Sequence, residues 1–150
     1  MSDAPVTVKQ VLLQKIYLKD ASLELPLAPQ VFTRQWQPKL DVQVTTNLQP
    51  LNAEQHQVVL SITVTAKLDQ DVAFLAEVQQ AGLFTLKGID SDAEKKRVLG
   101  TDCPNILFPF ARETVAELVQ RAGFPQFLLQ PIDFNSLYAE HLRKAEEARH

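Results

Sequence analysis

Apolar and polar residues alternate along four stretches in the first two-thirds of the chain, with the period of two that is typical of half-buried β-strands. The pattern predicts strands over residues 11–25, 40–48, 58–68 and 72–83. Polar Asp69-Gln70-Asp71 fits a tight turn before the last of them, so strands two to four form an antiparallel meander. Lys19-Asp20-Ala21, inside the long first strand, is where we expect a bulge or bend.

The connection between the first two strands, residues 26–38, is too long for a hairpin and contains Pro26, Pro29 and Pro38. A connection of this length lets the first strand skip its neighbour in sequence and lie beside the fourth. The predicted strand order is therefore one, four, three, two, which is Greek-key-like.

The last third of the chain has helical patterns. Ser91-Asp92-Ala93-Glu94 has the spacing of a capping box, and the segment after it ends at Gly100. A second helix begins near Pro104 and ends at Gly123, and its interior Pro109 removes a backbone hydrogen bond at a cost of ~3 kcal/mol. A third helix follows a cap at Asp133. Its apolar face carries Phe134, Leu137, Tyr138, His141 and Leu142, and we expect the charged tail 143–150 to be flexible.

Length and composition fit a single globular domain over residues 1–150. Hydrophobic residues make up 45% and charged residues 22% of the chain. The net charge of -3 argues against nucleic-acid binding, and no apolar run reaches the ~18 residues that suggest a membrane span. One cysteine and the lack of a secretory signal pattern at the N-terminus favour the cytoplasm.

Residues with catalytic or metal-binding chemistry form no known motif. Cys103, His56, His141 and His150 share no ligand spacing, so neither a metal nor a cofactor is expected. Cys103 precedes a helix, which would lower its thiol pKa, but a buried core residue is the favoured interpretation. Asp20 and Glu24 would suit acid–base chemistry, yet exposed acids on an edge strand are commoner than catalytic pairs. We therefore predict that the protein is not an enzyme.

The predicted strands carry more apolar residues than one sheet face and two helices require. Strict alternation makes the first strand apolar on both faces, with Leu12, Ile16 and Leu18 on one and Val11, Leu13 and Tyr17 on the other. The fourth strand likewise has Phe74, Ala76 and Val78 opposite Leu75 and Leu83. Because something must cover the second face, we predict self-association.

Further apolar residues lie in two proline-rich connections: Val31, Phe32, Trp36, Phe124, Phe127, Leu128 and Leu129. Each of them alone is most simply a plug at the end of the core. Together they would form a groove for an extended polypeptide, which the prolines keep from collapsing when it is empty. Both interpretations remain open from the sequence.

The segment Cys103-Pro104-Asn105-Ile106-Leu107-Phe108-Pro109, followed by Ala111-Arg112-Glu113, closely resembles the signature of the bacterial protein-export chaperone SecB. Residues 16–20, 28–32, 36–38, 63–66, 74–80 and 124–126 also resemble this family, in the same order. The resemblance implies an α+β protomer with a four-stranded antiparallel sheet and two main helices on one face, assembled as a dimer of dimers. It also implies an ATP-independent cytoplasmic holdase, without cofactor, that binds unfolded secretory precursors and delivers them to the export ATPase SecA.

The resemblance also assigns roles to residues. The SecA-docking surface of the family falls on Asp20, Glu24, Leu75 and Glu77, and the pleat independently puts Leu75 and Glu77 on one face. Ala76, Val78 and Gln80 match positions important for assembly, and we add Tyr17, Phe108 and Phe110 as interface candidates. Two other hypotheses are a small-molecule-binding or enzymatic domain with a closed pocket, and a purely structural oligomer.

Overall fold

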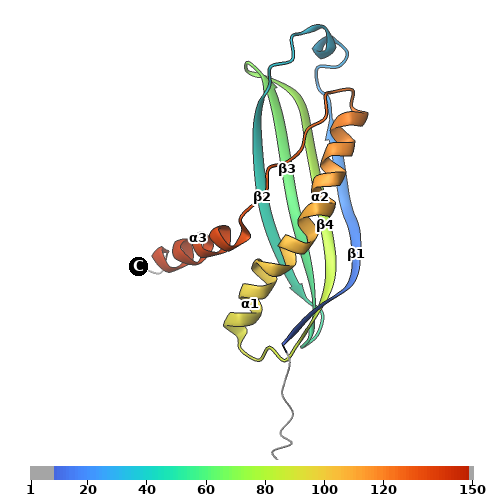
Figure 1. Ribbon diagram of the computed structural model, residues 1–150. Helices are drawn as coiled ribbons and strands as arrows, with labels where there is room; N and C mark the ends of the chain where they lie inside the picture. The colour runs from blue at the N-terminus through green and yellow to red at the C-terminus, as the bar shows by residue number, and fades with distance from the viewer. Residues whose placement is uncertain (1–8, 149–150) are drawn as a thin grey trace, which may run out of the picture.

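A single antiparallel sheet forms the centre of the computed structural model, which describes residues 9–148 (Figure 1). Its strands are β1 (Gln10–Glu24), β2 (Lys39–Pro50), β3 (Gln55–Leu68) and β4 (Asp71–Lys87), in the order β1-β4-β3-β2. The predicted strands and their order are confirmed. The connection from β1 to β2 contains the short 3₁₀-helix η1 (Gln30–Thr33) and lies beyond one end of the sheet (Figure 1).

The two faces of the sheet differ in what packs on them. Helix α2 (Asp102–Arg121) lies on the face that carries the even-numbered residues of β3 and, from Phe74 on, of β4 (Figure 1). At Gly82 on this face an added Cβ would come within 2.9 Å of the Leu107 side chain, so glycine allows α2 to approach the strand closely. We call this the covered face and the opposite one, with Leu75, Glu77 and Gln79, the open face.

The core lies between the covered face and α2. Val58, Leu60, Ile62 and Val64 of β3 are each 0% exposed. Helix α2 buries one stripe of residues at spacings of three and four: Cys103, Leu107, Phe108, Ala111, Val115 and Val119. Pro109 is interior to α2, as predicted, and lies outside this buried stripe.

The helix ends follow the sequence signals. Ser91 Oγ accepts a hydrogen bond from the Glu94 amide at 3.3 Å at the start of α1 (Asp92–Gly100). Asp133 Oδ1 accepts one from the Ser136 amide at 3.1 Å at the start of α3 (Phe134–Glu147). The Ser136 hydroxyl donates a second hydrogen bond to Asp133 Oδ2 at 2.7 Å, and this bond together with the amide bond holds the pKa of the Asp133 carboxyl below its usual value. Gly123, with φ of 94°, follows α2 in the left-handed region that its position as a helix stop predicts.

Two irregularities in β1 correct the prediction that this strand is apolar on both faces. The register against β4 shifts between Leu13 and Lys15 and again between Leu18 and Asp20, where a bulge was expected. Each extra residue reverses which side chains face α2. As a result Val11, Leu13, Ile16, Leu18 and Leu23 all lie on the covered face, and the open face keeps only Leu12 and Tyr17 among the large apolar residues of β1.

Helix α3 departs from the expected packing of two main helices on one face. Its main contacts are with α1 and α2, and it projects away from the sheet (Figure 1). Phe134 anchors it, because its ring is 4% exposed and meets the Phe108 ring edge-on at a centroid distance of 6.1 Å. The helix continues to Glu147 with a Glu140–Lys144 ion pair at 3.4 Å, so the predicted tail from Arg143 is largely helical.

Candidate functional site

Four aromatic side chains from three parts of the chain meet at one end of the sheet. Trp36 stacks on Phe124 with ring centroids 4.6 Å apart, and Phe32 lies 5.2 Å from the same ring. Phe74 of β4 lies below them, 5.3 Å from Phe124 and 6.3 Å from Trp36. We call Phe32, Trp36, Phe74 and Phe124 the aromatic cap; it joins the β1–β2 connection to the segment after α2.

The predicted groove residues fall into two groups. Val31, Phe124 and Leu129 are 2%, 6% and 5% exposed and close the end of the core, as the plug interpretation expects. Phe32 and Leu128 are 50% and 56% exposed, and Trp36 and Phe127 are half-buried against the core. A ligand could therefore reach the second group directly and the first only after a rearrangement.

An apolar hollow that the sequence interpretation missed lies between β2 and α3. It has a volume of about 740 Å³ and is lined by Val44 and Leu48 of β2 and by Leu137, Tyr138, His141 and Leu142 of α3. Leu48, Leu137 and Leu142 are exposed, so the hollow is open to solvent. Two signals pointed to it separately, the alternation of the second strand and the apolar face of the last helix, but nothing in the sequence placed them opposite each other.

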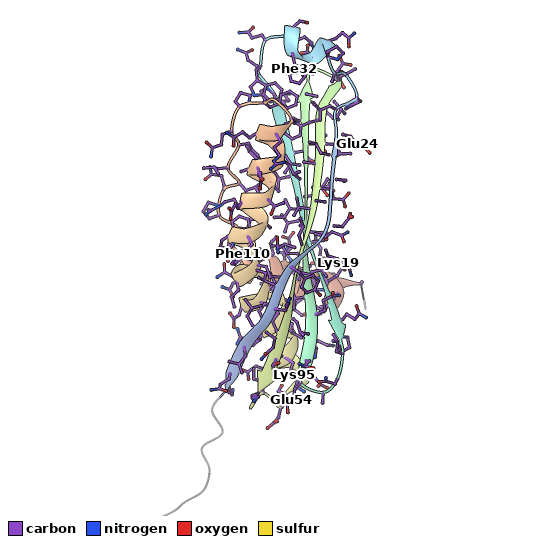
Figure 2. The ribbon with its side chains drawn as sticks, turned by 90° about the vertical axis from the view of Figure 1, so that its right-hand side faces the viewer. Lys19, Glu24, Phe32, Glu54, Lys95 and Phe110 are labelled. Atoms are coloured by element: carbon purple, nitrogen blue, oxygen red, sulfur yellow. The ribbon has the colours of Figure 1, made fainter. Side chains whose placement is uncertain are left out.

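The four predicted SecA-docking residues lie together on the open face. Glu24 pairs with Leu75 across β1 and β4, Ser22 pairs with Glu77, and Asp20 pairs with Gln79. Asp20 and Glu24 are therefore the diagonal neighbours of Glu77 on one face. Figure 2 shows Glu24 and Phe110 on opposite sides of the sheet. We call Asp20, Glu24, Leu75 and Glu77 the acidic patch.

Three predicted interface residues lie inside the protomer instead. Ala76 and Val78 are 0% exposed and Gln80 is 5% exposed, because all three are on the covered face beneath α2. Gln80 Nε2 donates a hydrogen bond to the Tyr17 carbonyl at 3.0 Å. In the protomer these three residues are therefore part of the core, and their importance for assembly stays a prediction.

The aromatic interface candidates also divide. Phe108 is 6% exposed, packs on Phe134 and has the Arg112 guanidinium 5.8 Å from its ring centre, so it belongs to the core of its own protomer. Phe110 is 44% exposed and lies one helical turn from Ile106, which is 38% exposed. The half-buried Tyr17 hydroxyl donates a hydrogen bond to Gln57 Oε1 on the open face.

Cys103 is a core residue. Its side chain is 0% exposed, and burial, with a smaller contribution from the charge of Asp102, raises the pKa of the thiol to about 12. The activated-thiol interpretation is therefore wrong.

Among residues 9–148 no three His, Cys, Asp or Glu side chains gather in an arrangement that could ligate a metal ion. No helix in the same range has the length and apolar character needed to cross a membrane.

The fold itself belongs to a known class. A solved Mycobacterium tuberculosis SecB-like chaperone, in complex with a ChAD peptide from the HigA1 antitoxin, superimposes with a TM-score of 0.66 over 82% of this chain and 88% of its own, at 22% sequence identity. The class is therefore a SecB-like α+β fold.

Sequence comparison identifies the family. The family model "Preprotein translocase subunit SecB" matches residues 5–145. The protein-export protein SecB of Hydrogenovibrio crunogenus is 47% identical over 93% of both chains, and that of Ectopseudomonas mendocina is 45% identical over 93% of this chain and 86% of its own. The chain belongs to the SecB family of protein-export chaperones, as its motifs indicated.

Proposed function

We propose that this protein is an ATP-independent holdase of the cytoplasm that binds unfolded secretory precursors, keeps them competent for translocation and delivers them to SecA. The proposal rests on the observation that two different candidate binding surfaces lie on opposite sides of the sheet. The aromatic cap and the apolar hollow lie on the helix side, whereas the acidic patch lies on the open face. A precursor and a docking partner could therefore be bound at the same time.

A chaperone that binds the unfolded precursor but not the folded one can keep the precursor unfolded without any further activity. A ligand that binds only the unfolded state stabilises that state by mass action, without ATP. Exposed Phe32 and Leu128 and the hollow beside β2 offer several weak apolar contacts. An extended polypeptide that occupies more than one of them gains affinity by avidity, and a folded domain cannot reach them together. The open, mostly apolar hollow disfavours the alternative of a closed small-molecule pocket.

The test of holding is the refolding of a slowly folding precursor after dilution from denaturant, with and without the protein. We expect a saturable delay that the folded mature form does not relieve. Leu128→Ser should shorten the delay, whereas Leu51→Ser, a matched change at a residue of similar exposure (55% against 56%) in the β2–β3 turn, should not. Refolding at the spontaneous rate with saturating protein would refute the proposal.

For the acidic patch we propose docking of SecA through charge and apolar contact. Glu77→Lys should weaken SecA binding at low salt and leave precursor binding unchanged, since a charge at such a rim mainly sets encounter rate and salt sensitivity. Glu54→Lys, the same charge reversal at the far end of the sheet (Figure 2), is the control. Equal SecA affinities for wild type and Glu77→Lys at two salt concentrations would remove the docking role.

We propose a homotetramer, a dimer of dimers, as the assembled form. Leu13 and Leu18 on edge strand β1 are 39% and 49% exposed, and Ile106 and Phe110 on α2 are exposed on the same side of the sheet. Unpartnered apolar residues on an edge strand and an adjacent helix favour a symmetric interface. Light scattering should give four times the 16.9 kDa protomer mass, and Phe110→Asp should lower it while Leu142→Asp on α3 should not.

A further inference from the structure

The ring faces in the aromatic cap on which a ligand would stack are already covered by other side chains of the protein. Phe124 is 6% exposed because Phe32 and Trp36 from the β1–β2 connection lie against it. A polypeptide therefore cannot stack on Phe124 while these two side chains stay in place. We call residues 26–38 the strap.

The strap packs on the core through Leu27, Val31 and Trp36 and has one charged attachment to the sheet. Val31 is 2% exposed, and its amide donates a hydrogen bond to the Leu27 carbonyl at 2.8 Å. Beyond Val31, Arg34 reaches the β3–β4 turn. Its Nη1 donates to Asp71 Oδ2 at 2.9 Å, and its Nη2 lies 3.4 Å from both Asp69 Oδ2 and the Leu68 carbonyl oxygen. Within the described residues, the side-chain hydrogen bonds from the strap to the sheet all come from Arg34.

We propose that the strap closes the aromatic cap in the free protein and that Arg34, held by Asp71 and Asp69, is the latch that sets how often it opens. The inference deepens the proposed function, on which it rests: Arg34 is a positioning residue that acts on polypeptide binding through Phe32 and Trp36. Opening lifts Phe32 and Trp36 away from Phe124 while Val31 stays in the core. The occupant of the opened site is an extended, apolar-rich segment of an unfolded chain.

The latch is of a strength that suits a switch rather than a permanent closure. The carboxylates are exposed, Asp69 at 95% and Asp71 at 57% of their side chains, and the Arg34 side chain is 33% exposed. Exposed ion pairs are weak and screened by salt, so the loss of one changes an equilibrium by roughly 1.5-fold to fivefold. Apparent affinity equals intrinsic affinity multiplied by the open fraction, and it should rise by the same factor when the latch is removed.

Two substitutions of opposite charge make the prediction specific. Arg34→Ala and Asp71→Ala change the net charge in opposite directions but break the same contact. Both should open the strap. The double variant should behave like Arg34→Ala, because Arg34→Ala already removes the contact with Asp71 together with the weaker ones to Asp69 and the Leu68 carbonyl. Lys9→Ala is the matched control, since it removes an ion pair with Glu94 (3.0 Å) at the other end of the sheet.

The first measurement needs no ligand. Trp36 is the only tryptophan, so acrylamide quenching of its emission reports whether it leaves Phe124. We expect Arg34→Ala and Asp71→Ala to raise the quenching constant, Lys9→Ala to leave it unchanged, and added NaCl to raise it in wild type but not in the two latch variants. Quenching at the wild-type level in both latch variants overturns the inference.

The second measurement is the affinity for fluorescein-labelled, reduced and carboxymethylated α-lactalbumin, which stays unfolded. Both latch variants should bind it about 1.5-fold to fivefold more tightly than wild type. Unchanged or weaker binding in both, or opposite changes that follow net charge, overturns the latch. If no variant binds this probe or an unfolded precursor, the proposed function fails while Trp36 quenching still decides the strap; if wild type binds and the latch variants match it in both measurements, the latch alone fails.

Discussion

The two faces of β4 differ completely although their residues alternate along one strand. Ala76 and Val78 are 0% exposed beneath α2, whereas Leu75 and Glu77, one step away, are half-buried on the open face beside acidic residues of β1. A one-residue step along this strand therefore separates the core of the protomer from a surface that a partner could reach.

The comparison changes how substitutions in this strand should be interpreted. A change on the covered face acts on folding, and through folding on every activity, including assembly. A change on the open face leaves the core intact and can test a single interaction. Defects in assembly and defects in docking can thus arise from adjacent residues for unrelated physical reasons.

The largest predicted effect is that of Val78→Asp. It replaces a fully buried side chain by a carboxyl that has no partner in the core, at a cost of about 4 kcal/mol or more. We expect loss of the folded protomer rather than dissociation into folded subunits. Urea unfolding followed by circular dichroism measures the change.

Glu77→Lys is the matched test on the open face. As a surface substitution without a hydrogen-bonded partner in the structure, it should leave the free energy of unfolding within about 0.5 kcal/mol of wild type. If Val78→Asp gave a stable folded dimer or monomer, or Glu77→Lys unfolded the protein, the assignment of the two faces would be wrong.

The second predicted effect comes from the register that aligns β1 with these faces. Ser22 lies in a regularly paired part of β1, opposite Glu77, so its deletion forces neighbouring residues to reverse their faces. Either Leu23 turns to the open face and Glu24 to the covered one, or Asp20 turns to the covered face and Ala21 to the open one. We expect roughly 2–3 kcal/mol of destabilisation, seen as a lower urea midpoint and faster amide exchange in β1.

Deletion of Gln70 is the control for the shortened chain, since it lies in the β3–β4 turn and leaves the β1 register unchanged. A Ser22 deletion with wild-type stability and exchange would mean that the register against β4 does not set the faces of β1.

The strands, their order and the helix caps could be predicted because each has a local cause. Alternation in strands two and three, the capping box at Ser91 and Gly123 after α2 involve residues within a few positions of one another. The length of the 26–38 connection was enough to give the strand order.

What the sequence did not predict depends on contacts between distant residues. Two bulges reversed the faces of β1, so a strand that alternates as if apolar on both sides is apolar mainly on one. Which face α2 covers decided that Val78 is core, and no local pattern specifies this choice. The hollow between β2 and α3 needed the position of α3, which depends on the packing of Phe134 against Phe108. For the candidate site, the pleat correctly grouped Leu75 with Glu77, whereas the contact between Arg34 and Asp71 spans 37 residues and left no sequence signal.

The smallest predicted effect uses Cys103 as a reporter of the covered side. Its buried thiol has a pKa raised to about 12, whereas an unfolded cysteine ionises near 8.5. Below about pH 8.5 both states keep the proton and the thiol does not affect stability. As the pH rises above that value the unfolded chain loses the proton and the folded one keeps it, so the free energy of unfolding falls by up to about 1.4 kcal/mol per pH unit.

Urea unfolding measures this effect. Between pH 8 and pH 10 the free energy of unfolding of wild type should fall by about 1–2 kcal/mol more than that of Cys103→Ala, whatever the difference between the two proteins at pH 8. Equal pH dependence of the two proteins, or rapid reaction of the folded wild type with a thiol reagent at pH 8, would mean that the covered side admits water.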